Sequence, residues 1–107
     1  MGMYHSLAGV ALLFFPMWFF QHIGPFPPFN QHYEGDLGAY VLAVGIGLLV
    51  ATPRPENYPW VIRVGALGSL FHAANHLTGA LLSPSFSAWA QTLVLAVTGL
   101  FLLAASQ

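Results

Sequence analysis

The feature that most constrains the fold of this sequence is a succession of four long apolar stretches, separated by short segments rich in proline and polar residues. The stretches cover residues 4–23, 34–52, 60–82 and 86–105. Each is close to the length of about 20 residues that an α-helix needs to cross a bilayer. A helix satisfies its own backbone hydrogen-bonding groups in hydrocarbon. The pattern therefore predicts an all-α fold, a four-transmembrane-helix antiparallel bundle with short loops, formed by one domain over residues 1–107.

Composition excludes several other classes of protein. Only 5% of the residues are charged and 57% are hydrophobic, whereas a soluble domain carries about 25% charged residues. The absence of cysteine excludes disulfides, thiolate metal sites and cysteine nucleophiles. Two basic residues do not form a nucleic-acid-binding patch. We therefore expect an integral membrane protein whose partner is the lipid bilayer, with no nucleic acid.

Local signals refine the expected helices. Pro16 should kink the first stretch, because proline removes a backbone hydrogen bond. The prolines of the segment 25–28 forbid helix there. Asp36 is expected in the first turn of the second helix, where the helix dipole favours an acid. Glycines such as Gly38 and Gly45 are expected where helices touch.

The basic residues suggest an orientation. Arg54 and Arg63 lie in or beside the segment between the second and third stretches, and Arg63 is expected to snorkel to the nearby surface. The positive-inside rule places that segment in the cytoplasm. With four spans, both termini of a multi-pass protein are then cytoplasmic as well.

The antiparallel topology gathers polar residues in one half of the membrane. His72 and His76 are four residues apart, so they share one helix face. The small or polar stripe of each helix, which in the second includes Asp36 and Tyr40, is expected to face the bundle interior. The polar residues placed in this half are His22, His32, Glu34, Asp36, Tyr40, His72, Asn75, His76 and Gln91.

Three interpretations of this polar cluster remain open. In the first, His72 and His76 bind a metal ion with Asp36, Glu34 or His32 completing the shell, or one of them is an axial ligand of haem. In the second, the cluster relays protons or holds a quinone or a lipid head group. In the third, the side chains hydrogen-bond to one another, with Asn75, Gln91, His22 and Tyr40 in the network.

The third interpretation is compatible with a structural or accessory subunit of a larger membrane complex, or with a homo-oligomer. An enzyme acting on a soluble substrate is disfavoured, because no soluble domain is expected. No residue is assigned a catalytic role.

Two short segments carry a resemblance. Phe29-Asn30-Gln31-His32-Tyr33-Glu34-Gly35-Asp36-Leu37-Gly38-Ala39-Tyr40, followed by His72-Ala73-Ala74-Asn75-His76-Leu77, resemble small uncharacterised bacterial four-helix membrane proteins of the DoxX-like type. In these proteins an acidic stretch opens the second helix and a histidine-rich stretch lies in the third. The resemblance implies a protein of the bacterial inner membrane and no established activity.

Overall fold

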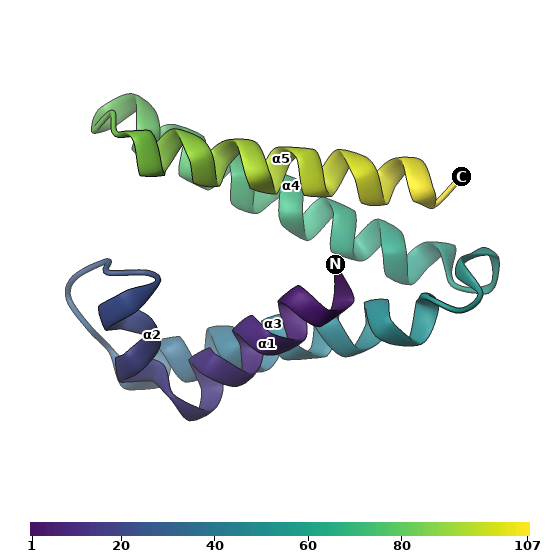
Figure 1. Ribbon diagram of the computed structural model, residues 1–107, viewed down its shortest axis with the longest axis horizontal. Helices are drawn as coiled ribbons and strands as arrows, with labels where there is room; N and C mark the ends of the chain where they lie inside the picture. Colours follow the sequence, from purple (N-terminus) through teal and green to yellow (C-terminus); the bar gives the residue numbers. More distant parts are fainter. The chain divides into compact units, whose positions relative to one another are not determined.

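The computed structural model describes residues 1–107 and is all-α, as predicted (Figure 1). The helices are α1 (Gly2–Phe14), α2 (Pro16–His22), α3 (Gln31–Ala51), α4 (Pro59–Leu82) and α5 (Phe86–Ala105), with a short 3-10 helix η1 (Pro55–Asn57). The chain divides into two compact units, Met1–Thr52 and Pro53–Gln107. Each unit contains one pair of long helices packed side by side, α1 with α3 and α4 with α5.

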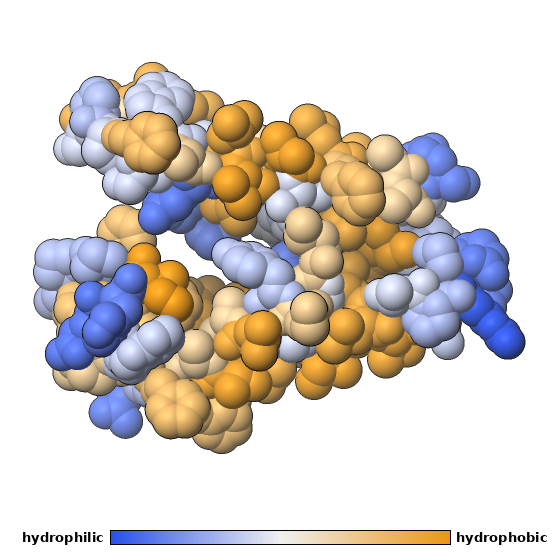
Figure 2. Space-filling view, in the orientation of Figure 1, coloured by the Kyte–Doolittle hydropathy of each residue, from blue (hydrophilic) through white to orange (hydrophobic).

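Two helices, α3 and α5, are long and apolar enough to cross a membrane. At 21 and 20 residues, each is about 30 Å long. Hydrophobic side chains cover much of the surface visible in Figure 2. A surface of this kind is suited to lipid rather than water. Helix α4 has 24 residues, but His72, Asn75 and His76 make it less apolar than these two.

The first predicted span, residues 4–23, is two helices that meet at a bend of 115°. Helix α1 ends at Phe14, and Phe15 leaves helical geometry with φ −132° and ψ 48°. Pro16 then opens α2. Proline disfavours helical geometry in the residue before it and is well suited to the first position of a helix. Pro16 therefore breaks this segment, whereas the sequence predicted only a kink.

Helix α3 begins three residues before the predicted boundary at residue 34. The side chain of Asn30 caps it, because Oδ1 accepts a hydrogen bond from the backbone N–H of Tyr33 at 3.1 Å. Asp36 is therefore the sixth residue of the helix, and the acid of the first turn is Glu34. The prediction that Asp36 lies in the first turn is wrong, because the capping residue precedes the apolar run that was used to place the boundary.

Helices α1 and α3 pack antiparallel through glycines. A Cβ on Gly9 would lie 2.4 Å from the backbone N of Leu42, and a Cβ on Gly45 would lie 2.4 Å from the backbone N of Ser6. Side chains do not tolerate such distances, so the two backbones are as close as only glycine permits. The facing pairs are Gly2 with Leu49, Ser6 with Gly45, Gly9 with Leu42 and Leu13 with Gly38.

These pairs have a regular register. On both helices the facing positions alternate between steps of four and three residues, which is the seven-residue repeat of closely packed helices. The prediction that Gly38 and Gly45 lie at a helix contact is confirmed. The face of α3 that packs on α1 is not the stripe of Asp36 and Tyr40, since Tyr40 is 75% exposed.

In the second unit, α4 and α5 pack antiparallel along a stripe of small residues. The buried residues of α4 are spaced by one, three, four or seven positions, which keeps them on one face of the helix. They are Ile62, Gly65, Ala66, Ser69, Ala73 and Ala80. On α5, a Cβ on Gly99 would lie 2.6 Å from Cγ of Leu70. Thr98 and Leu102 are buried beside it, as predicted for the interior stripe of this helix.

Arg63 extends across this hairpin to the end of α5. Its Nη2 donates to the backbone carbonyl of Ser106 at 3.2 Å, and its Nε donates to Oγ of Ser106 at 3.4 Å. Its Cζ lies 5.1 Å from the centroid of the Trp60 ring. A cation beside the last carbonyls of a helix is favoured by the helix dipole. Arg63 thus bonds to the end of the neighbouring helix α5. The sequence had predicted that its side chain would snorkel to the nearby surface.

Candidate functional site

The two histidines of α4 face each other. The Nε2 atoms of His72 and His76 are 3.1 Å apart, and the ring centroids are 4.8 Å apart with an angle of 51° between the planes. In such a contact one imidazole donates its N–H and the other accepts it with a lone pair. The helical spacing of four residues therefore brings two imidazoles into contact, as the sequence predicted.

This histidine pair lies at the margin of the contact between α4 and α5. Ala73, next to His72 in the chain, is 5% exposed, whereas His76 is half-buried and His72 is exposed. Asn75 is also exposed, and its backbone carbonyl accepts a hydrogen bond from Oγ1 of Thr78 at 2.7 Å. The pair thus flanks the buried Ala73, with one half-buried imidazole and one exposed imidazole.

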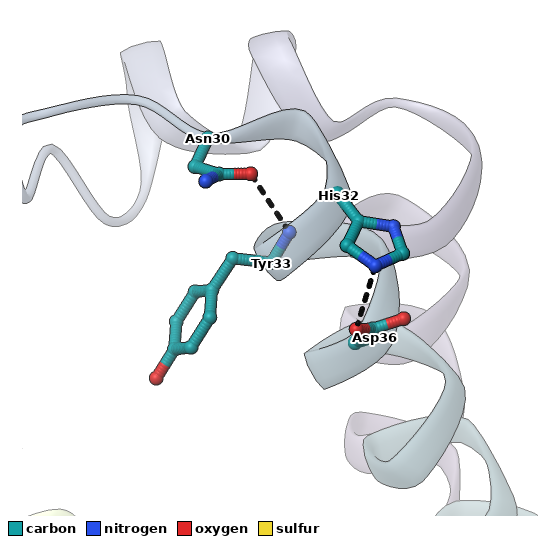
Figure 3. Close-up of polar contacts among 4 residues, drawn as sticks. All are labelled: Asn30, His32, Tyr33 and Asp36. Carbon is teal, nitrogen blue, oxygen red and sulfur yellow. Dashed lines mark hydrogen bonds and ion pairs between the residues drawn. The ribbon is translucent and has the colours of Figure 1, made fainter.

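A second pair, His32 and Asp36, lies near the start of α3 (Figure 3). Nε2 of His32 is 3.4 Å from Oδ2 of Asp36, and the two side chains are 90% and 62% exposed. Asn30 and Tyr33, drawn in the same figure, form the N-cap that begins this helix. Exposed ion pairs contribute only about 0–1 kcal/mol to stability. The pair therefore adds little to stability, and it places an imidazole and a carboxyl group together on the surface.

An open groove lies beside His32 and Asp36, where α1 turns into α2. Its volume is about 580 Å³. It combines an apolar wall from the bend with polar side chains from α3, and all of it belongs to the first unit. The lining residues are Leu13, Phe14, Pro16, Gln31, His32, Gly35, Asp36 and Ala39.

The other predicted site residues are more dispersed. Nδ1 of His22 is 2.8 Å from the backbone carbonyl of Trp18, and its ring stacks on the Trp18 ring with centroids 5.2 Å apart. Glu34 is half-buried and lies two positions from both His32 and Asp36, a spacing that places it on another side of the helix. Gln91 is half-buried on α5, and Tyr40 is exposed on α3.

Within each unit, the structure forms pairs and no larger ligand cluster. No group of three or more His, Asp or Glu side chains is placed to hold a metal ion. His32, Glu34 and Asp36 belong to the first unit, and His72 and His76 belong to the second. The predicted five-residue site thus draws on both units and stays a prediction.

Comparison with known proteins identifies no relative of this chain. No family model matches the sequence, and neither a curated protein nor a solved structure is significantly similar to it. The chemistry of the two side-chain pairs is therefore the basis for a functional interpretation.

Proposed function

We propose that this protein is a four-span integral protein of a bacterial inner membrane, and that it serves as a small structural or accessory subunit of a larger membrane complex or homo-oligomer. In this proposal α1 and α2 form a broken first span, and α3, α4 and α5 are the second, third and fourth spans. The resemblance of residues 29–40 and 72–77 to DoxX-like proteins supports the bacterial location.

The observation that carries the proposal is the exposure of Asn75 on α4. Asn75 lies about 24 Å along the helix from Pro59 and about 10 Å from its other end. In a spanning helix this position is surrounded by hydrocarbon, which offers no hydrogen bonds. Polar side chains at this depth normally face other polar groups. A protein surface should therefore cover this side of α4.

Exposed apolar side chains near Asn75 are compatible with a partner helix that packs on this face of α4. Phe71 is 72% exposed and Val64 is 60% exposed. Between helices in a membrane, packing and interhelical hydrogen bonds replace the hydrophobic effect as the driving force. A partner helix that offers hydrogen-bonding groups to Asn75 and apolar contacts to Phe71 would satisfy this face.

The proposal includes a polar network in one membrane half. In a four-span topology, His32 and Asp36 on α3 would fall in the same half of the membrane as His76 on α4, and His22, Glu34, Tyr40 and Gln91 are expected in that half as well. Interhelical hydrogen bonds of this kind contribute about 0.6 kcal/mol each on average. Their combined effect would hold the spans in register and orient the polar face of α4 for assembly.

Native mass spectrometry of the protein in a mild detergent tests the proposal. The chain has a mass of 11.6 kDa, and we expect an assembly well above this mass. A variant combining His72→Ala and Asn75→Ala should dissociate it, and Asp36→Asn should weaken it. Asn57→Ala, at the exposed last residue of η1, is the matched control and should leave it intact. A single chain in every mild detergent and in nanodiscs would refute the subunit role.

A further inference from the structure

We propose that His72 and His76 together bind one divalent transition-metal ion of borderline softness, such as Cu²⁺ or Zn²⁺, through their Nε2 atoms. This inference goes beyond the role of a membrane subunit and does not depend on it. It needs only the pair on α4, so it holds for one chain regardless of how the two units or several copies are arranged.

The distance between the two nitrogens matches that of two ligands on one ion. Imidazole nitrogens bind Zn²⁺ at about 2.0–2.1 Å, so two of them lie about 2.9 Å apart at a right angle and about 3.3 Å apart at a tetrahedral angle. The observed separation of the Nε2 atoms of His72 and His76 is 3.1 Å. The rings are inclined by 51°, and the spacing of four residues places both on one side of α4.

The chemistry of the contact also favours a cation. The two nitrogens now share one proton, which one ring donates and the other accepts. A metal ion takes the place of that proton when both rings are neutral and carry their hydrogen on Nδ1. Only a tautomeric exchange in one ring and small rotations of the side chains are needed, because the backbone of α4 already fixes the spacing.

The location of the pair suits a metal site. In the single chain His76 is half-buried and His72 is exposed, so an ion added to the protein in detergent reaches the pair from the His72 side. Two imidazoles leave the remaining coordination positions to water. A set of neutral nitrogen ligands favours Cu²⁺ over Zn²⁺ and Ni²⁺, and disfavours Mg²⁺ and Ca²⁺, which prefer oxygen.

The other histidines lack this arrangement. His22 directs Nδ1 to the Trp18 carbonyl and stacks on that ring. His32 faces a carboxylate at 3.4 Å, and both side chains are largely exposed. His5 directs Nδ1 to the backbone carbonyl of Met1 at 3.1 Å. Only the pair on α4 brings two imidazole nitrogens within 3.1 Å of each other, so the site should be distinguishable by single substitutions.

Copper titration of the protein, purified in detergent without a polyhistidine tag, tests the site. Cu²⁺ is added against a weak chelating competitor, and binding is followed by electron paramagnetic resonance and by the visible absorption band. The variants are His72→Ala and His76→Ala, with His22→Ala and His32→Ala as matched controls. Circular dichroism verifies that each variant keeps its helix content, and His72→Gln provides a second, conservative loss of the ligand.

We expect one Cu²⁺ per chain, with a spectrum showing coordination by two imidazole nitrogens. Removing either histidine of the pair should weaken binding by at least about tenfold, because the second ligand of a chelating pair binds at high effective concentration. The two control variants should bind as the unmodified protein does. Equal binding by the unmodified protein and the His72 and His76 variants, or loss of binding in a control instead, would overturn the proposal. Neither result bears on the native mass of the assembly.

Discussion

The side chain of Arg63, near the start of α4, bonds to the end of α5 and so joins the two ends of the α4–α5 hairpin. Replacing it with alanine removes two hydrogen bonds to Ser106 and the cation beside the last turn of α5. Hydrogen bonds to charged groups contribute about 1.5–3 kcal/mol when well formed, and these are 3.2 and 3.4 Å long. We therefore expect Arg63→Ala to lower the free energy of unfolding by about 1–2 kcal/mol, measured by thermal denaturation in detergent.

The other arginine provides the control for this prediction. Arg54 is exposed in the segment before η1, so Arg54→Ala should leave the unfolding temperature unchanged. Arg63→Lys keeps the charge but not the planar donor group that bonds to both acceptors, and should give an intermediate loss. Equal stability of the Arg63→Ala and Arg54→Ala variants would mean that the contact with Ser106 contributes nothing.

Capping residues provide a second prediction at this scale. Asn30 caps α3, and Ser85 caps α5 through a hydrogen bond from the backbone N–H of Ala88 to Oγ at 3.1 Å. Replacing either with alanine leaves one N–H at the helix start unsatisfied and typically costs about 1 kcal/mol. Chemical denaturation followed by circular dichroism should show this loss for both variants, whereas Asn57→Ala should show none. A change below experimental error at Asn30 would argue against the cap.

These residues differ in how far the sequence reveals them. Asn30 directly precedes the helix and follows a proline-rich segment, so its capping role is a local signal that the boundary at residue 34 overlooked. Arg63 and Ser106 are 43 positions apart, and their contact depends on the register between two helices. The 3.1 Å contact of His72 with His76 was predictable, because it needs only one regular helix.

At the scale of elements, the glycine contacts between α1 and α3 give the sharpest prediction. A Cβ at Gly9 or Gly45 would lie 2.4 Å from a backbone nitrogen of the facing helix, and a backbone cannot rotate out of the way as a side chain can. The helices must separate, and overpacking of this kind costs about 1–3 kcal/mol. We expect Gly9→Ala and Gly45→Ala to lower the unfolding temperature clearly.

Another glycine of the same helix is the matched control. A Cβ at Gly35 would meet nothing within 4 Å, and alanine is favoured over glycine inside a helix by about 0.5–1 kcal/mol. Gly35→Ala should therefore raise the unfolding temperature slightly or leave it unchanged. The prediction fails if Gly45→Ala and Gly35→Ala shift it in the same direction by the same amount.

The helices also show which structural features the sequence patterns predict and which they do not. The apolar stretch at residues 86–105 became α5 with the predicted bounds, because it is predominantly apolar and Ser85 and Ser106 flank it. The stretch at residues 4–23 became two helices, because hydropathy does not register the geometry that Pro16 imposes on Phe15. Gly38 and Gly45 were expected at a contact, but their partners follow from a register that composition does not encode.

For the whole molecule, the sequence predicted the all-α class and its membrane character, because both depend on the length and hydropathy of single segments. A shared site formed by His72, His76, His32 and Asp36 is a different kind of prediction. It requires the placement of one helical unit against the other, which depends on contacts that no local pattern specifies. The pairs within each unit are therefore the part of the site that local spacing could anticipate.

The number of spans and their orientation provide the last prediction. Reporter fusions of alkaline phosphatase, active outside the cytoplasm, and green fluorescent protein, fluorescent inside it, measure the side on which a residue lies. If the positive-inside rule holds and Arg54 and Arg63 lie at the cytoplasmic face, fusions at Gln107 and in the segment 53–58 should fluoresce. Alkaline phosphatase inserted in the segment 24–30 or fused after Ser85 should be active.

The bend at Pro16 makes a comparison of the two ends of the chain informative. If α1 and α2 together cross the membrane, residues 1 and 107 lie on the same side, because four crossings return the chain to its starting face. If the 115° bend instead returns this segment to the face from which it entered, three crossings remain and the two ends lie on opposite sides. A fluorescent fusion at Met1 combined with an active phosphatase at Gln107 would therefore replace the four-span topology with three spans. A phosphatase active at both ends would keep four spans and reverse their orientation, in contradiction to the positive-inside argument.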